Sequence, residues 1–251
     1  MFTSSGKFTP NMAGKIDVLV VAGGGAGNSA GGGAGGLVYS ANKAVTAKGY
    51  TISVGRGGAA LLAGNGAMNH GVKSSAFGIT ANQGMGAKSW DRQALTTMNV
   101  YGSGAGSGHS STGHYVASGY TTGQGNAGGA ERVNISPYPG AGGGGAGGAG
   151  GATSVPTQQG AGGLGLNYGS TFGTAVGDGG YFASGGVGSC HNGGCRAQKA
   201  PQGGGGSNTN YVKRDGNRDG AANTGGGGAG AHAGGIAGAG GSGVVIVRYL
   251  A

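Results

Sequence analysis

Twelve consecutive residues, Gly140 to Gly151 (GAGGGGAGGAGG), contain no side chain larger than a methyl group. Similar runs cover Gly23 to Gly36, Gly203 to Gly206 and Gly225 to Gly243. A backbone without side chains cannot build an apolar core. These runs are therefore either disordered linkers or segments whose backbones pack directly against one another.

The disordered alternative follows from composition. The 71 glycines and 5 prolines make up 76 of the 251 residues, a share of about 30% that is typical of low-complexity chains. Glycine also loses more backbone freedom on folding than any other residue, about 0.5–1 kcal/mol more than alanine in regular structure. A folded chain of this composition therefore needs dense compensating interactions.

The packed alternative supplies such interactions. A polyproline-II-like helix has three residues per turn, rises about 3.1 Å per residue and points its N–H and C=O groups outward. Where glycine faces the neighbour, these helices approach closely enough to hydrogen-bond to one another, so that buried amides find partners. Charged residues are abundant in disordered chains but make up only 8% of this one. The composition favours an irregular glycine-rich fold of packed, threefold polyglycine-II helices.

Short apolar stretches near both ends of the chain predict β-strands. The two strongest are Ile16 to Ala22 (IDVLVVA) and Val244 to Leu250 (VVIVRYL), which are rich in β-branched residues. Weaker candidates are an opening strand around Phe2 and Phe8, and the stretches Leu37–Ser40, Tyr50–Val54 and Phe77–Ala81. No window shows apolar residues at a 3.6-residue period, so we expect almost no α-helix.

We expect one domain, residues 1–251, with two parts. Residues 1–54 and 244–251 supply a β-strand framework, in which the first and last strong strands pair and bring both termini to one end. Residues 55–243 supply the glycine-rich helices and variable loops. The sequence contains no run of about twenty apolar residues, so we expect no membrane span. The opening MFTSSGKFTP lacks the pattern of a signal peptide. The chain is therefore expected to fold in the cytoplasm.

Several blocks occur in order along nearly the whole chain. They are FTSSGKFTP, IDVLVVAGGGAG, GGGAGGLVYS, YTISVGRGG, SSAFGITA, TTGQGNAGG, GAGGGGAGGAGG and the closing GAGGSGVVIVRYL. In this order they resemble the glycine-rich module of bacteriophage tail proteins and distal tail-fibre adhesins. The resemblance implies a polyglycine-II sandwich at or near the tip of a host-recognition fibre. It also implies two partners, another virion protein such as the tail fibre, and a host surface glycan or outer-membrane protein.

A dinucleotide site is the main false lead. Gly25, Gly27 and Ala30 follow an apolar strand and fit G-x-G-x-x-G/A. Such a site needs a helix after the glycines and an acid about 20 residues further on. Here more glycines follow, and the next acid after Asp17 is Asp91. We expect no bound cofactor.

Cys190 and Cys195 lie in SCHNGGC, with His191 between them. Two cysteines and one histidine are one ligand short of a closed zinc site. Unpaired thiols, a disulfide and partial metal ligation all remain open, although a reducing cytoplasm disfavours a disulfide during folding. The histidines have no metal-type spacing, and we predict no metal site for them; they are His70, His109, His114, His191 and His232.

Charge does not point to catalysis or to nucleic acid. The six acids are scattered, and the close pair Asp215 and Asp219 alternates with basic residues, so we predict no enzyme. The formal charge of +9 has one local cluster, Lys213, Arg214 and Arg218, which is too short for a nucleic-acid tract. Solubility, or contact with an anionic cell envelope, explains the charge equally well.

The segments that interrupt the glycine background are the candidate receptor loops, because recognition residues concentrate on loops held by a stiff scaffold. The candidates are Trp90, Arg92, His109, His114, Tyr115, Tyr120, His191, Arg196, Tyr211, Lys213 and Arg214. The alternative is that these segments are connectors or pack against a neighbouring subunit.

The terminal strands are the candidate docking surface, with Phe2, Phe8 and Tyr249 as apolar contacts. The function that these expectations favour is a receptor-binding, tail-fibre tip protein of the virion, assembled in the host cytoplasm. The alternative function is a self-associating glycine-rich protein, a homo-oligomer that builds an extracellular fibre or surface layer.

Overall fold

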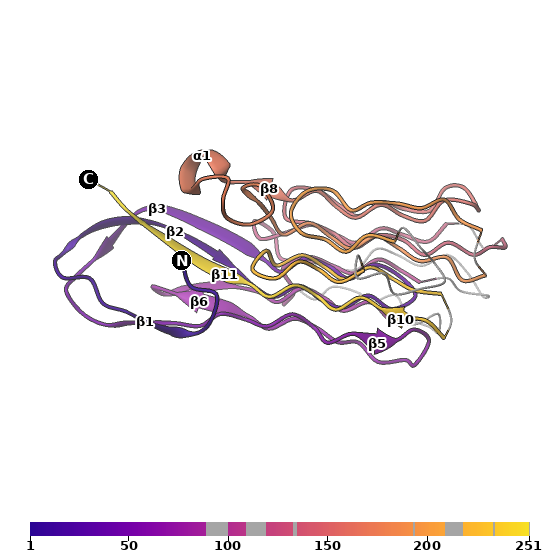
Figure 1. The fold of residues 1–251 in the computed structure, drawn as a ribbon, viewed down its shortest axis with the longest axis horizontal. Coiled ribbons are helices and arrows are strands. Elements are labelled where there is room, and N and C mark those ends of the chain that lie inside the picture. The colour runs from indigo at the N-terminus through magenta and orange to yellow at the C-terminus, as the bar shows by residue number, and fades with distance from the viewer. Residues whose placement is uncertain are drawn as a thin grey trace.

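The computed structural model describes residues 1–88, 100–108, 119–132, 135–192, 194–208, 218–232 and 234–250. Figure 1 shows an elongated molecule, with most of the strands at one end and a bundle of extended runs along the rest of its length. Both termini lie at the strand end, as predicted.

The central sheet consists of β2 (Gly14–Val21), β3 (Leu37–Val45) and β11 (Val244–Tyr249), in the antiparallel order β11-β2-β3. The predicted pairing of the first and last strong strands is therefore confirmed. β3 is longer than its predicted stretch. It continues past a bulge opposite β2, where Asn42 adopts a positive φ of 53°, a conformation that asparagine tolerates better than most residues.

The other strands are short and pair two by two, all antiparallel. They are β1 (Gly6–Phe8) with β4 (Tyr50–Ile52), β5 (Leu61–Leu62) with β10 (Ile236–Ala237), β6 (Ser74–Ala76) with β7 (Ile79–Ala81), and β8 (Leu166–Asn167) with β9 (Tyr181–Phe182). Phe77 and Gly78, at φ 53° and 78°, form the tight turn between β6 and β7, where positive φ is required. The described residues contain one helix, the four-residue α1 (Gly169–Phe172), so the expected near-absence of α-helix is confirmed.

Side chains from the two faces of the central sheet form two apolar clusters, because successive strand residues point to opposite faces. One cluster joins Ile16, Val18 and Val20 to the aromatic residues of the β1–β4 and β6–β7 hairpin region, including Phe8 and Phe77. The other joins Leu19, Val21, Val244 and Ile246 to Phe182 and the residues around α1. This pair of clusters is the conventional hydrophobic core of the molecule.

The glycine runs are held by hydrogen bonds between their backbones. In the run from Gly23 to Asn28 the acceptor segment changes at each residue and returns after three. The N–H groups of Gly23 and Ala26 donate to Val72 and Asn69, those of Gly24 and Gly27 to Gly241 and Gly238, and those of Gly25 and Asn28 to Gly33 and Ala30, all at 2.9–3.0 Å.

The carbonyl groups of the same run accept hydrogen bonds from three further segments. Gly84 and Ala87 donate to Gly23 and Ala26, Gly58 donates to Gly24, and Gly228 and Ala231 donate to Gly25 and Asn28. Six neighbouring segments therefore surround this run. The run from Gly140 to Gly145 shows the same threefold change of acceptors, namely segments 186–189, 104–107 and 148–151.

These runs need glycine because their backbones touch. A Cβ atom at Gly27 would lie 2.0 Å from the carbonyl oxygen of Ala229, and one at Gly31 would lie 2.0 Å from that of Gly186. The fully buried alanines Ala26, Ala30 and Ala34 occupy the few positions of the first long run that have room for a methyl group. The glycine runs described here are packed segments and not disordered linkers.

Candidate functional site

Most of the predicted receptor residues lie outside the described residues. These are Trp90, Arg92, His109, His114, Tyr115, Tyr211, Lys213 and Arg214. The structure describes three of the candidates, Tyr120, His191 and Arg196. It brings His191 and Arg196 together on one loop.

This loop, called here the disulfide loop, runs from Ser189 to Arg196. Cys190 and Cys195 are bonded to each other, which is one of the three states that the sequence left open. The loop is hydrogen-bonded to the segment around Tyr138. The N–H of His191 donates to the carbonyl oxygen of Tyr138 and the N–H of Asn192 donates to that of Pro137, both at 3.2 Å. The side chain of His191 is therefore held at a fixed place beside Tyr138.

His191 and Tyr138 form an edge-to-face ring pair with their centroids 6.2 Å apart. Burial lowers the pKa of His191, and electrostatic repulsion from His232 lowers it further. The neutral imidazole is thus favoured near pH 7, and it can both donate and accept hydrogen bonds. Together with the phenol of Tyr138, this ring offers polar and aromatic contacts without a fixed charge.

Two buried amide side chains connect the disulfide loop to the glycine runs. Nε2 of Gln159 donates to the carbonyl oxygens of Arg196 at 3.2 Å and Asn208 at 3.1 Å. Nδ2 of Asn208 donates to Oε1 of Gln159 at 3.0 Å and to the carbonyl of Gly188 at 3.2 Å. The sequence gives no sign of the roles of Gln159 and Asn208, because a lone amide in a Gly/Ser-rich context has no recognisable pattern.

The disulfide loop lies at the end of the molecule away from the termini. Ser189 Oγ donates to the carbonyl oxygen of Ser29, in the turn that follows the first glycine run. The adjacent Asn28 accepts the N–H of Gly64 at 2.9 Å, just after β5. Because β5 and β10 lie at the end opposite the termini (Figure 1), the disulfide loop belongs to that end, called here the loop end.

An exposed apolar pair also lies at the loop end. Leu62 of β5 and Ile236 of β10 are directly opposite each other in the ladder, and they are 52% and 45% exposed. Beneath them lie the buried side chains of Ala63, Ala231 and Ala237. The loop end therefore combines polar, aromatic and aliphatic contact groups.

Tyr120 is not part of the loop end. Its neighbour Thr121 accepts a hydrogen bond from Nδ2 of Asn82 at 3.0 Å, and the carbonyl of Asn82 accepts the N–H of Gly36 at 2.7 Å. Gly36 immediately precedes β3, so Tyr120 lies where the glycine runs meet the sheets. The structure does not bring it together with His191.

The predicted docking residues are only partly available for contact. Phe8 is half-buried, with its ring centroid 6.3 Å from Phe2, 5.5 Å from Phe77 and 5.8 Å from Tyr249. Phe2 also exchanges backbone hydrogen bonds with Val245 on β11, which covers part of that strand edge. Tyr249, at 57% exposure, is the exposed aromatic of the three.

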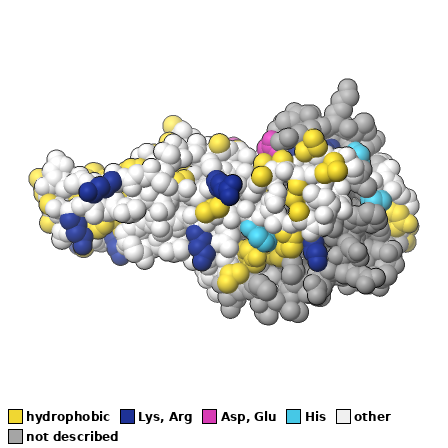
Figure 2. Space-filling view, turned by 90° about the horizontal axis from the view of Figure 1, so that it is seen from below, with side chains coloured by type: hydrophobic (Ala, Val, Ile, Leu, Met, Phe, Trp, Pro, Cys, Tyr) yellow, Lys and Arg dark blue, Asp and Glu magenta, His cyan; other side chains and the backbone are white. Residues whose placement is uncertain are grey.

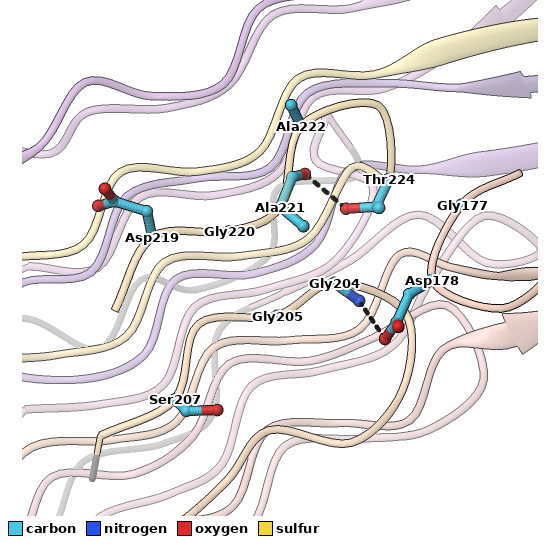
Figure 3. Close-up of a pocket in the computed structure, with 10 residues that line it drawn as sticks. All are labelled: Gly177, Asp178, Gly204, Gly205, Ser207, Asp219, Gly220, Ala221, Ala222 and Thr224. Carbon is cyan, nitrogen blue, oxygen red and sulfur yellow. Dashed lines mark hydrogen bonds between the residues drawn. The ribbon is translucent and has the colours of Figure 1, made fainter. Parts of the chain in front are cut away.

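A polar groove of about 460 Å³ opens between glycine segments 203–207 and 219–224 (Figure 3). Its carboxylates already bind backbone amides. Oδ2 of Asp178 accepts from Gly203 at 2.9 Å and Gly204 at 3.3 Å, and Oδ1 of Asp219 accepts from Ala239 at 2.7 Å. A pair of carboxylates that acts on one glycosidic bond flanks that bond from both sides. Figure 3 shows the carboxylates of Asp178 and Asp219 apart from each other and not turned toward a common point.

Among the residues that the structure describes, no group of three or more His, Cys, Asp or Glu side chains is placed to hold a metal ion. None of the described helices is long and apolar enough to cross a membrane.

Comparison with known proteins gives one result on the family. Residues 3–250 match a family model described as a glycine-rich domain. The match covers both the strands and the glycine runs. No curated protein matches the chain.

Proposed function

This chain belongs to the glycine-rich domain family, which it matches over residues 3–250, and we propose that its glycine runs are threefold polyglycine-II helices. The supporting observation is the rotation of hydrogen-bond acceptors, which repeats every third residue in the run from Gly23 to Asn28. A helix with three residues per turn points every third N–H in the same direction. The run from Gly23 to Asn28 has six neighbouring segments, which is the number expected for rods packed side by side in a hexagonal array.

We propose that the protein is a receptor-binding structural protein at the tip of a bacteriophage tail fibre. The observation that carries this proposal is the separation of the two ends. Strands and termini lie at one end, and the disulfide loop with the β5–β10 pair lies at the other (Figure 1). At about 3.1 Å per residue, the seven steps from Val21 to Asn28 span about 22 Å. A stiff rod of this kind can attach at one end and recognise a target at the other.

The chemistry of the loop end suits a host surface glycan or an outer-membrane protein. His191 and Tyr138 present hydrogen-bonding groups and ring surface, and Leu62 with Ile236 presents exposed apolar surface. Aromatic residues combined with adaptable polar groups are typical of recognition loops. In this proposal the protein is not an enzyme, carries no cofactor, binds no nucleic acid and does not insert into a membrane.

The proposal places the protein in the virion, after assembly in the host cytoplasm. The reducing conditions of the cytoplasm keep cysteine thiols reduced. The Cys190–Cys195 bond would then form after release of the particle, when the disulfide loop reaches an oxidising medium.

The alternative is a self-associating protein that forms an extracellular fibre or surface layer. Exposed residues of the longest glycine run, Gly147 and Ala149, and the 60% exposed Leu164 beside that run favour it. They would offer an outer backbone surface on which a second copy could pack. Negative-stain images of the purified protein distinguish the two functions, since long homopolymers support the alternative.

The direct test is binding to whole cells of the bacterium that the phage carrying this gene infects, together with protection of those cells from infection. Wild-type protein should bind and protect. Tyr138→Ala combined with His191→Ala should weaken binding about tenfold or more, because both rings are lost from the loop end. Tyr120→Ala is the matched control, since Tyr120 is an exposed tyrosine away from that end. No binding by the wild type, or equal loss in both variants, would contradict the proposal.

A further inference from the structure

Four lysines gather at the strand end, and this group is called here the lysine end. They are Lys7, Lys15, Lys43 and Lys48, of which Lys43 is half-buried and the others are exposed. Strand register brings them together. Lys15 lies opposite Ala44 and Lys43 lies opposite Ile16 in the β2–β3 ladder, so these two lysines sit on neighbouring rungs at the end of the sheet, one on each of its faces.

The other two lysines flank the adjacent hairpin. Lys7 lies opposite Thr51 in the β1–β4 pair, one position from Tyr50. The ammonium of Lys48 lies 5.4 Å from the centre of the Tyr50 ring, which is within the range of a cation–π contact. All four charges therefore surround the same set of strand ends. In Figure 2, Lys and Arg side chains are visible at this end and no acidic side chain is visible there.

Within residues 1–88 and 234–250, which supply the strands of this end, no acid is free to neutralise these lysines. Asp17 is the sole acid in residues 1–88, and residues 234–250 contain none. Asp17 is buried, with Oδ2 2.5 Å from the guanidinium of Arg248 and Oδ1 accepting the N–H of Asn42 at 3.0 Å. Its pKa is held below the ordinary value first by the Asn42 hydrogen bond and then by Arg248. Its negative charge is therefore already used inside the fold.

Exposed apolar side chains accompany the lysines, and one of them, Tyr249, lies with its ring centroid 5.8 Å from that of Phe8, the chain neighbour of Lys7. Tyr249 is 57% exposed and lies opposite Ile16 on the central sheet. Met1 and Met12 are 61% and 73% exposed. An exposed aromatic and aliphatic centre with a charged border has the composition of a protein interface, in which the centre is apolar and the rim polar.

We propose that the lysine end binds one copy of an acidic protein partner, whose carboxylates meet the four lysines around an apolar pocket for Tyr249. The inference rests on the proposed function, in which this end attaches to the rest of the virion. Complementary charge steers such an encounter and fixes its register. Like charges on the unbound end repel one another, and a partner with carboxylates removes that repulsion.

Charge disfavours a second copy as the occupant, and ring geometry disfavours nucleic acid. A second copy docked end to end would place lysines against lysines. Single-stranded nucleic acid needs aromatic faces on which bases can stack. The ring pairs Phe2–Phe8 and Phe8–Phe77 are edge-to-face, with interplanar angles of 80° and 78°, and they are partly buried in the cluster.

The test uses the full chain and a fluorescent peptide of glutamate and leucine as the probe. Single-stranded DNA of equal charge and vesicles of phosphatidylglycerol and phosphatidylcholine are the competing probes. The peptide should bind best, and its affinity should fall as NaCl is raised from about 50 to 300 mM. Replacing all four lysines by glutamate should weaken peptide binding about tenfold or more, since each exposed charge pair contributes a small increment.

The matched control reverses four exposed cations elsewhere, Arg56→Glu, Lys73→Glu, Arg132→Glu and Lys199→Glu. It changes net charge equally and should leave peptide binding within about twofold of wild type. Equal losses in both variants, or tighter binding of DNA or vesicles than of the peptide, would overturn the proposal. Tyr249→Ser, with all lysines retained, should also weaken binding, and an unchanged affinity would count against the apolar pocket.

The same variants separate this inference from the proposed function. The lysine-end variant should bind host cells as the wild type does, because the loop end is untouched. If the wild type binds the peptide but not host cells, the receptor function fails and the acidic partner stands. If lysine-to-glutamate exchange prevents folding, the four lysine-to-glutamine exchanges remove the charge without reversing it, and they should also weaken peptide binding, by a smaller factor.

Discussion

Replacing Gly143 by alanine tests whether backbone contact holds the glycine runs together. The added Cβ would lie 1.9 Å from the carbonyl oxygen of Gly32. Ordinary contact begins at 3.4 Å, so one backbone has to move by about 1.5 Å. The carbonyl of Gly32 accepts the N–H of Gly186 at 3.0 Å, and the N–H of Gly32 donates to Gly228 at 2.8 Å.

A shift of this size breaks both hydrogen bonds, because N–H···O bonds are rarely longer than about 3.2 Å. Each buried group left without a partner costs about 1–3 kcal/mol. Alanine regains about 0.4–1 kcal/mol by restricting the unfolded chain. The free energy of unfolding should therefore fall by about 1–5.5 kcal/mol, which corresponds to a decrease in Tm of about 2–22 °C for a protein of this size.

Gly148→Ala in the same run is the matched control. A Cβ there would lie 3.6 Å from the Leu164 side chain, which is ordinary contact, so the Tm should rise by about 1–4 °C. Thermal unfolding followed by circular dichroism measures both variants. If Gly143→Ala melts within about 2 °C of the wild type, the runs are not held by close backbone contact, and this reasoning is refuted.

Three further outcomes follow from single groups. Burial lowers the pKa of His70, whose Nδ1 accepts a backbone N–H, so stability should be complete above about pH 6.5 and fall below it. In urea denaturation at pH 8, 6 and 5, His70→Asn should show a smaller loss at acid pH. Arg248→Ala leaves the buried Asp17 carboxylate without its ion pair. Because the arginine side chain is 44% exposed and Asp17 keeps the Asn42 hydrogen bond, the cost in urea denaturation should be about 1–3 kcal/mol, against a smaller loss for Arg248→Lys. Cys190→Ser with Cys195→Ser should cost about 2 kcal/mol for this short loop while the circular-dichroism spectrum stays that of the wild type.

The strand framework was predictable because its side chains carry a local signal. Apolar β-branched runs mark β2 and β11, and their positions at the two ends of the sequence suggest that they pair. The extension of β3 beyond Ser40 has no such signal, since Asn42 and Lys43 are held by pairing with β2. The sequence also placed Phe77 in a strand, whereas it occupies the turn at positive φ. The requirements of the hairpin outweigh its strand propensity.

Packing of the glycine runs could be expected from composition, but their arrangement could not. A run such as Gly140 to Gly151 has no side chain larger than a methyl group to specify a neighbour, so its neighbours are fixed by the rest of the fold. The same limit applies to the sites. His191 and Arg196 were selected as loop residues, whereas Gln159 and Asn208 gain their role through burial. The lysine end exists because strand register joins positions far apart in the sequence.

The enclosure of the run from Gly23 to Asn28 has a consequence for biosynthesis. Gly24 and Gly27 bond to Gly241 and Gly238, which leave the ribosome more than two hundred residues later. During synthesis, the run from Gly23 to Asn28 therefore lacks these hydrogen-bond partners until residues 238–241 have been made. Contacts of such high sequence separation slow folding and expose the waiting segment to aggregation. Once formed, the run cannot detach without releasing bonds to six segments, so the native state should unfold slowly and persist by kinetic stability.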